Sequence, residues 1–262
     1  MKKAVIFILI LFLNCATTGP GGKRSLILIS AQQEISIGKE LSKQVEKQSK
    51  VVQDSSTNSY VSQIGNRIAK VSDRPDLNYT FKVLADSQIN AFACPGGFIY
   101  VYSGLLKKMD NEAQLAAVLS HEISHVVARH SVQRLQQVLG LEILVSIALG
   151  KQSSQSTEKI ANVGIGLISQ GYSRQNEFEA DKFGTYYMAQ AGYNPLGMSE
   201  LLTKLSQGDN GKPSGFEGLF ASHPDTQDRI KRVKEQTATL SEEIMSRPVN
   251  QEKYEKIIQR LK

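Results

Sequence analysis

The sequence of 262 residues has few cysteines, no long apolar run outside its N-terminus and no large excess of charge of one sign. Two cysteines, Cys15 and Cys94, are too few for a disulfide-stabilised scaffold. No apolar stretch reaches the roughly 20 residues of a membrane-spanning helix, which excludes a multi-span membrane protein. Internal repeats are also absent. Hydrophobic residues make up 40% and charged residues 21%, so an ordinary globular protein is expected.

The net charge of +6 has two interpretations. A solvated, lysine-rich surface accounts for it, and so would attraction to anionic lipid or nucleic acid. No nucleic-acid-binding motif is present, so we expect no nucleic-acid partner.

The N-terminus has the pattern of an export signal. Two lysines precede an uninterrupted apolar run over residues 4–13, which is too short to span a bilayer and typical of a signal peptide. Cys15 follows this run in a position that resembles the lipobox of bacterial lipoproteins, although Asn14 replaces the usual Ala or Gly. We expect a signal peptide over residues 1–14, then a lipidated cysteine and flexible tether over residues 15–30. A plain secretory signal with an incidental cysteine is the alternative.

Lipidation would place the mature protein at a membrane. Each buried CH₂ of an acyl chain contributes about 0.8 kcal/mol, so several chains on Cys15 would anchor it stably. We therefore expect a bacterial cell-envelope protein on the periplasmic side, anchored by lipid. Ala16 is not acidic, which in enteric bacteria favours the outer over the inner membrane. Cys94 would remain as a lone thiol, and we expect it to be a small core residue.

The rest of the chain, residues 31–262, has the periodicity of a mostly helical α+β domain. Helices are expected over residues 31–50 and over residues 58–71, the latter capped by Asn58. Asn111 has the sequence pattern of a helix cap, and no Gly or Pro interrupts residues 105–139, which predicts a long helix that forms the buried spine.

Three further segments complete the expected fold. A second long helix should lie between Glu158 and Ala191, and residues 225–262 should form amphipathic helices broken near Pro248. The apolar segment 141–149 is either a core helix or an exposed segment near the active site or the lipid.

A small antiparallel sheet is predicted before the spine helix. Alternation over residues 79–83 predicts one strand, and two more should flank the Cys-Pro-Gly-Gly sequence, over residues 89–93 and 98–102. Pro95 followed by Gly96 suits the two central positions of a type II turn.

The sequence His-Glu-Ile-Ser-His over residues 121–125 points to metal chemistry. On a helix, His121 and His125 leave the same face one turn apart, so their ring nitrogens can meet one tetrahedral ion. Glu122 lies beside the ion, where it can hold a water molecule. This is the pattern of zinc peptidases, in which the glutamate is the general base. The alternative, two core histidines and a buried glutamate without a metal, would be costly.

A third ligand must come from elsewhere. Ser131 occupies the place of the third histidine in the extended His-Glu-x-x-His-x-x-Gly-x-x-His pattern, which excludes that class, and His130 is expected to be structural. Glu177 and Asp181 share one face of the second long helix. Glu177 can be the third ligand, and Asp181 can accept a hydrogen bond from the far nitrogen of a ligand histidine. Glu179 points away and is expected to be a surface or structural residue.

Five groups of motifs, in order over about residues 30–235, resemble those of one zinc metallopeptidase family. This family includes the HtpX heat-shock protease, the CAAX prenyl protease, the mitochondrial protease Oma and the periplasmic proteases BepA and LoiP. The similarity is to the lipoprotein branch, without the tetratricopeptide array of BepA-type members. The motifs are Glu34-x-x-x-Gly38; Asn90-Ala91-Phe92-Ala93-Cys94-Pro95-Gly96-Gly97 with Ser103-Gly104-Leu105-Leu106; His121-Glu122-x-x-His125-x-x-x-Arg129-His130; Ser173-Arg174-x-x-Glu177-x-x-Ala180-Asp181-x-x-Gly184; and Ser222-His223-Pro224-x-x-x-x-Arg229-Ile230.

The resemblance implies a zincin-like fold and further site residues. It implies Glu177 as the third ligand, in agreement with the helix geometry. It also implies that His223 lies at the mouth of the active site, where it either stabilises the oxyanion or binds zinc as a fourth ligand in a latent state. A loop histidine held by Pro224 is the alternative. Arg229 is implied to pair with an active-site carboxylate.

We therefore expect an endopeptidase with one Zn²⁺ per chain that hydrolyses misfolded or misassembled envelope proteins, with Glu122 as the base. Envelope assembly machinery is a further expected partner.

One predicted strand is a candidate for substrate binding. Extended polypeptide would pair with its edge, through main-chain hydrogen bonds that tolerate many sequences. The strand consists of Phe98, Ile99, Tyr100, Val101 and Tyr102. An ordinary core strand is the alternative interpretation of these residues.

The alternative function is a catalytically latent, zinc-containing lipoprotein that acts as a chaperone or outer-membrane assembly factor, with His223 closing the site. A membrane-embedded CAAX-type protease is excluded because no membrane-spanning stretch is present.

Overall fold

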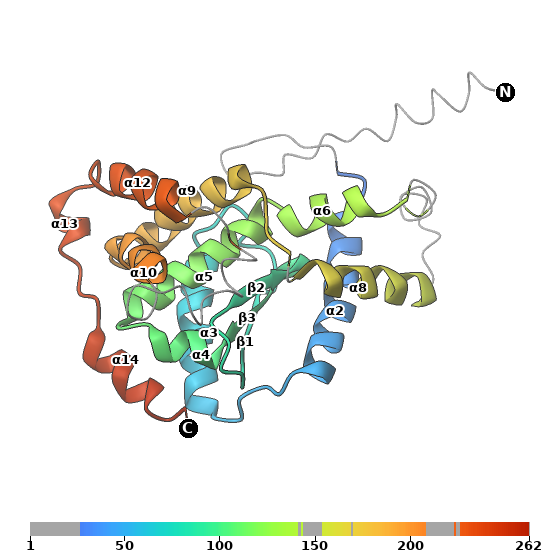
Figure 1. Cartoon of the computed structure of the whole chain (residues 1–262), viewed down its shortest axis with the longest axis horizontal. Helices are drawn as coiled ribbons and strands as arrows, with labels where there is room; N and C mark the ends of the chain where they lie inside the picture. The colour runs from blue at the N-terminus through green and yellow to red at the C-terminus, as the bar shows by residue number, and fades with distance from the viewer. Residues whose placement is uncertain are drawn as a thin grey trace, which may run out of the picture.

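A computed structural model of the chain describes residues 27–140, 143, 154–168, 170–207, 223 and 226–261 (Figure 1). The predicted signal peptide, Cys15 and most of the tether lie outside the described residues, as does nearly all of the apolar segment 141–149. Within the described part, no helix is both long and apolar enough to cross a membrane.

The described elements are mostly helices around one small sheet, as predicted. In chain order they are α2 (Ala31–Gln48), α3 (Ser55–Ala69), β1 (Thr80–Leu84), β2 (Ala91–Cys94), the 3₁₀ turn η2 (Pro95–Gly97), β3 (Phe98–Tyr102), α4 (Ser103–Lys108), α5 (Glu112–Val127), α6 (His130–Val138), α8 (Ser154–Ile168), α9 (Arg174–Gln190), α10 (Leu196–Gln207), α12 (Thr226–Thr237), α13 (Glu242–Met245) and α14 (Gln251–Ile258).

Helix α5 is the centre of the fold. Every residue of α5 is buried, and the helix packs against α3, α9, α10 and β2. Figure 1 shows α9, α10 and α12 on one side of α5, and the sheet with α2 and α8 on the other. The predicted cap is confirmed, since the Asn111 side chain accepts a hydrogen bond from the Gln114 backbone N–H at 3.0 Å. The buried spine is therefore also confirmed.

The prediction of one continuous helix from the Asn111 cap to residue 139 was wrong. The chain leaves the helix at Arg129, which has a φ of 56°. Partners distant in sequence hold this left-handed conformation: the Arg129 guanidinium contacts the Glu34 carboxylate at 2.8 Å and the Ile29 carbonyl oxygen at 2.6 Å. No Gly or Pro marks the break, because the cause is a tertiary contact.

The sheet has the order β1-β3-β2 and is mixed. The predicted antiparallel pair is present, with Ala91 opposite Val101 and Cys94 opposite Phe98. The other pair, β1 with β3, is parallel, so the prediction of a wholly antiparallel sheet was wrong. Gly96 has φ 77° and ψ 10°, the values of the second central residue of a type II turn.

Two helix boundaries also differ from the predictions. Helix α3 begins at Ser55, and its cap is Asp54, whose carboxylate accepts a hydrogen bond from the Thr57 backbone N–H at 2.7 Å. Asn58 lies inside the helix, where its side chain accepts a hydrogen bond from the Val83 N–H and so links α3 to β1. The second long helix is divided into α8 and α9, and α9 is followed by Gly192, whose φ of 86° is typical of a helix C-terminus.

Both faces of the sheet are buried. Side chains of one face join the core formed by α3, α5, α9 and α10, and those of the other face join a second core with α2, α6 and α8. Cys94 is a free, buried thiol in the second core, as predicted, and burial raises the pKa of this thiol.

The first motif of the sequence fixes α2 against the turn. A Cβ atom at Gly38 would lie 1.8 Å from the Pro95 carbonyl oxygen, so only glycine allows this approach. One turn earlier, the Glu34 carboxylate accepts a hydrogen bond from the Gly96 N–H at 3.2 Å. The turn that precedes β3 is therefore held from the N-terminal helix.

Candidate metal centre and active site

Two histidines of α5 form the base of the site. His121 and His125 are one helical turn apart, both are buried, and their Nε2 atoms lie 3.0 Å from each other. Glu177 on α9 faces the same point, with one carboxylate oxygen 3.5 Å from His121 Nε2 and the other 3.5 Å from His125 Nε2. Because α9 packs directly against α5, the structure brings the three predicted ligands together.

His223 belongs to the same cluster. Its Nδ1 lies 3.1 Å from a Glu177 oxygen and 3.2 Å from His121 Nε2. One ligand atom from each of His121, His125, Glu177 and His223 lies within 4.8 Å of the others, and all four side chains are buried. The residue that the resemblance placed at the mouth of the site therefore lies among the ligand atoms.

Asp181 determines the tautomer of His121. Its Oδ1 lies 2.9 Å from His121 Nδ1. Burial raises the pKa of Asp181, but the adjacent Arg229 guanidinium outweighs this and holds the pKa well below its usual range. The ionised carboxylate only accepts, so His121 Nδ1 carries the proton and its Nε2 presents a lone pair to the cluster. This is the contact that we predicted for Asp181.

His125 is oriented in a similar way by His130. The two Nδ1 atoms lie 3.0 Å apart, so one of them carries a proton. With that proton on His125, its Nε2 lone pair also faces the cluster. Two lone pairs and a carboxylate directed at one point repel one another, and a cation at that point turns the repulsion into attraction. Two imidazoles with one carboxylate are a donor set that fits a divalent metal ion.

Arg229 on α12 binds two carboxylates of α9, those of Asp181 and Glu177. Its Nε and Nη2 donate to Asp181 at 2.7 and 2.8 Å, and its Nη1 lies 2.8 Å from Glu177 Oε2. Burial raises the pKa of Glu177, but His223 and Arg229 outweigh this and lower it overall. The pairing with an active-site carboxylate that the resemblance implied is thus present twice.

Glu122 differs from these paired carboxylates. It is buried, its Oε1 lies 3.6 Å from His223 Nε2, and its Oε2 has no hydrogen-bond partner among the described residues. Burial raises the pKa of Glu122, and the neighbouring histidines oppose the rise only in part. A buried carboxylate with a raised pKa and an unmatched oxygen is prepared to accept a proton.

Sequence analysis did not predict the contacts of His130 and Tyr172. The expected position of His130 assumed a continuous helix, but the break at Arg129 places its ring against His125. Tyr172, between α8 and α9, stacks on the His125 ring with centroids 4.1 Å apart. Glu179 Oε2 lies 3.9 Å from His130 Nε2, so Glu179 also faces this chain of contacts. No spacing rule connects these residues, because they meet only through the turns that end α5 and α8.

The prediction that β3 binds substrate by edge addition was wrong. Its residues pair with β1 on one side and β2 on the other, so β3 is the central strand and has no free edge; they are Phe98, Ile99, Tyr100, Val101 and Tyr102. Ile99 and Val101 pack in the core with α3 and α5, and Tyr100 packs in the second core with α2. All three side chains are at most 1% exposed. The alternative interpretation, an ordinary core strand, is therefore the one that the structure supports.

Strand β2 is the edge of the sheet next to α5. Its Ala93 carbonyl oxygen accepts a hydrogen bond from the Ser131 hydroxyl at 3.2 Å. An extended chain that pairs with this sheet near the ligand cluster would therefore have to pair with β2.

Comparison with known sequences identifies the family. Residues 55–237 match the sequence profile of Peptidase family M48. The chain belongs to this family. It is 34% identical over 183 residues to the mitochondrial metalloendopeptidase OMA1 of Schizosaccharomyces pombe, covering 68% of this chain and 52% of the relative. The match to the β-barrel assembly-enhancing protease of Escherichia coli K12 is 32% over 206 residues, 74% of this chain and 42% of the relative.

A third relative is more similar in length. The metalloprotease LoiP of Escherichia coli K12 is 31% identical over 176 residues, 66% of this chain and 67% of the relative. The chain spans about half the length of the first two relatives. The resemblance inferred from the motifs is therefore confirmed at the level of the family.

Proposed function

We propose that the protein is a zinc-dependent endopeptidase in which His121, His125 and Glu177 hold the ion and Glu122 is the general base. The observation that carries this proposal is the buried, unmatched Glu122 carboxylate beside the two imidazoles and Glu177. When bound there, zinc supplies Lewis acidity. Glu122 accepts a proton from the attacking water and later passes it to the leaving amine. Asp181 and His130 hold the two imidazoles in orientation.

His223 has two candidate roles in this scheme, and its one position in the structure provides the contacts for both. With its Nε2 facing Glu122, it donates to the oxyanion that develops on the substrate carbonyl. With its Nδ1 3.1 Å from Glu177 and 3.2 Å from His121 Nε2, it completes a set of four ligands. Four protein ligands are typical of closed structural sites. The role of His223 as a fourth ligand corresponds to the alternative function, a latent zinc protein that acts as a chaperone or an outer-membrane assembly factor.

The substrates we propose are misfolded or misassembled proteins of the bacterial envelope, bound in extended form along the edge of β2. Two observations support this location: one relative is named for β-barrel assembly, and the N-terminal sequence resembles a lipoprotein signal. Within this proposal, lipid on Cys15 holds the protein on the periplasmic side, at the outer membrane, near the envelope assembly machinery.

The test combines zinc analysis with casein hydrolysis by the full chain. The active-enzyme proposal predicts about one zinc per chain and cleavage in the wild type, with a Glu122→Gln variant that keeps zinc and loses cleavage. Zinc without cleavage in the wild type would favour the latent protein. In that case cleavage by His223→Ala would identify His223 as the block, and continued inactivity would contradict the peptidase proposal.

A further inference from the structure

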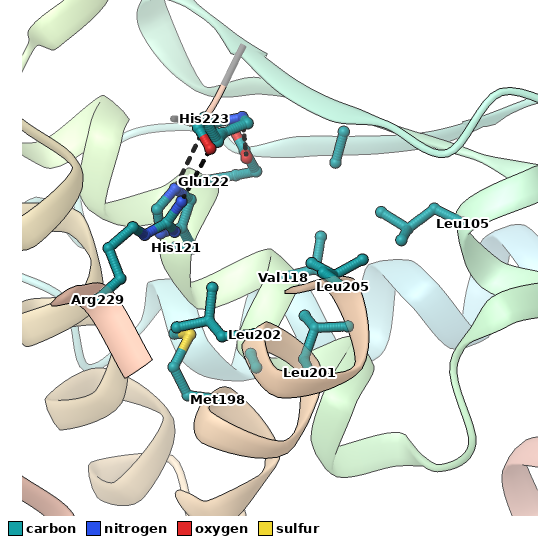
Figure 2. Close-up of a pocket in the computed structure, with 12 residues that line it drawn as sticks. Leu105, Val118, His121, Glu122, Met198, Leu201, Leu202, Leu205, His223 and Arg229 are labelled. Carbon is teal, nitrogen blue, oxygen red and sulfur yellow. Dashed lines mark hydrogen bonds and ion pairs between the residues drawn. The ribbon is translucent and has the colours of Figure 1, made fainter. Parts of the chain in front are cut away.

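A largely apolar cavity of about 40 Å³ adjoins the site. His121, Glu122, His223 and Arg229 line its polar end, and the other described residues of its wall are aliphatic or Met. Figure 2 shows the three site residues His121, Glu122 and His223 at one end of the cavity, with the side chains of α10 at the other.

Four elements build the apolar wall, and one of them, α4, contributes Leu105. Val118 precedes Glu122 by one helical turn on α5, so the helix that carries the base also lines the cavity. The edge strand β2 contributes Ala91. Helix α10 contributes a stripe with the spacing i, i+3, i+4 and i+7, formed by Met198, Leu201, Leu202 and Leu205.

We propose that this cavity is a specificity subsite that receives an aliphatic side chain of the substrate residue next to the scissile bond. The inference rests on the proposed peptidase function. Because Glu122 and His223 belong to the cavity wall, a peptide carbonyl placed at Glu122 has its neighbouring residue beside the cavity. Successive side chains of an extended peptide point to opposite faces, so one of the two residues that flank the bond is directed inward.

The size of the cavity restricts the side chain. A water molecule needs about 10–15 Å³ on this measure, so a cavity of about 40 Å³ holds three to four non-hydrogen atoms. Val and Leu fit this number, whereas Phe, Tyr and Trp exceed it.

The charged residues of the cavity wall restrict the substrate side chain further. Arg229 is the cation nearest the cavity, but its guanidinium already binds Asp181 and Glu177. An acidic substrate side chain would find this guanidinium occupied. A lysine could pair only with Glu122, and such a pair would prevent Glu122 from acting as the base. Charged residues are therefore excluded from this position.

The test uses the full chain and pairs of fluorogenic peptides that differ in one residue flanking the cleaved bond. At one of the two flanking positions, Leu or Val should exceed Ala in kcat/KM by about tenfold or more, since one methylene in an apolar pocket discriminates by about 10–200-fold. Phe and Asp should also be poor at that position. The other flanking position should show a weaker preference.

Two variants should change this preference in opposite directions. Ala91→Val adds two methyl groups to the cavity wall and should lower the Leu/Ala ratio of kcat/KM by about tenfold. Leu205→Ala enlarges the cavity and should raise the Phe/Leu ratio. Leu41→Ala makes the same truncation in the second core, away from the cavity, and should leave both ratios unchanged. A ratio of two kcat/KM values measured on the same preparation does not depend on the fraction of enzyme that is folded, because that fraction cancels.

The outcomes separate the two proposals. If the wild type cleaves none of the peptides or casein, the peptidase proposal fails. If it cleaves them without an aliphatic preference at either flanking position, the subsite proposal is overturned and the peptidase stands. The same conclusion follows if the preference exists but neither cavity variant changes it. The wild-type ratios test the subsite even if a variant does not fold.

Discussion

Two buried clusters of charged residues lie on the two sides of α5, and they differ in how completely their carboxylate oxygens are paired. In the cluster on the α2 side, Glu34 Oε1 binds Arg74 and the Gly96 N–H, while its Oε2 binds Arg74 and Arg129. Both oxygens therefore have two partners. In the cluster on the α9 side, Asp181 and Glu177 are also paired, but Glu122 retains an oxygen without a partner among the described residues.

The difference shows how a structural cluster can be told from a chemical one. Burial and charge are common to both, so neither property identifies a site. The Glu34 cluster joins α2, the turn before β3 and the end of α5, and the pairing of both Glu34 oxygens offsets part of its desolvation. The cluster around Glu122 leaves lone pairs unmatched at the place where three ligand atoms converge. Unmatched polar atoms are what a metal ion and a substrate can use.

The largest effect on stability should follow from removing the charge of the fully paired Glu34 carboxylate. Glu34→Gln leaves two arginines without their carboxylate and should lower the free energy of unfolding by about 3–5 kcal/mol. The measurement is urea denaturation of the apoprotein. Glu40→Gln, which removes a carboxylate paired only with an exposed lysine, is the control and should change little. A loss below about 1 kcal/mol for Glu34→Gln would contradict a structural role for the cluster.

The next effect concerns the support of His121. Asp181→Asn keeps the size of the side chain but removes the charge that fixes the His121 tautomer. Zinc affinity, measured by competition with a chelating dye, should fall about 10–100-fold. Unchanged affinity would mean that Arg229 and Glu177 suffice to orient the ligands.

A smaller loss of zinc affinity is expected at the second imidazole. His130→Phe removes the polar atom next to His125 Nδ1, and the partner lost is an imidazole rather than a carboxylate. Affinity should fall about tenfold, at the lower end of the range for such supports. Val132→Ala, a truncation in the second core on the same helix, is the matched control for packing. An equal loss in both variants would assign the effect of His130→Phe to stability alone.

The smallest effect should come from an exposed pair outside both clusters. The Arg260 guanidinium lies 3.1 Å from Asp54, the cap of α3, and its hydrogen bonds lower the pKa of Asp54 to about 2 from 3.8. Because the folded pKa is depressed, this stabilisation is complete above pH 3.8 and is lost as the pH falls toward 2. Asp54→Asn keeps the cap, so its urea midpoint should be slightly below that of the wild type at pH 6. The difference between the two urea midpoints should become smaller as the pH falls toward 2. A difference that does not change with pH would show that the charge of Asp54 is not its cause.

The sequence predicts the part of the site that depends on local spacing. His121 and His125, like Glu177 and Asp181, are separated by four residues on a helix, so each pair shares a face whatever surrounds it. The buried character of α5 and the Gly96 turn were also predictable from local pattern. The place of His223 and Arg229 required the family resemblance, because a loop residue has no periodicity to locate it.

Other features depend on contacts that no local rule contains. The break at Arg129 arises from Glu34 and Ile29, which lie far away in the sequence, and it alone brings His130 to His125. The parallel pairing of β1 places β3 in the centre of the sheet, and strand periodicity is the same for central and edge strands. Predicting substrate binding at β3 therefore failed for a topological reason.

The stability of the Glu122→Gln apoprotein is the most direct test of the distinction between the two clusters. An unmatched buried carboxylate contributes to chemistry at the expense of stability, so the neutral amide should unfold at an equal or higher urea concentration than the wild type. Casein cleavage by the zinc-loaded Glu122→Gln variant should be about 10²–10⁴-fold slower than cleavage by the zinc-loaded wild type. A destabilisation similar to that of Glu34→Gln, or cleavage at the wild-type rate, would contradict the assignment of Glu122 as the base.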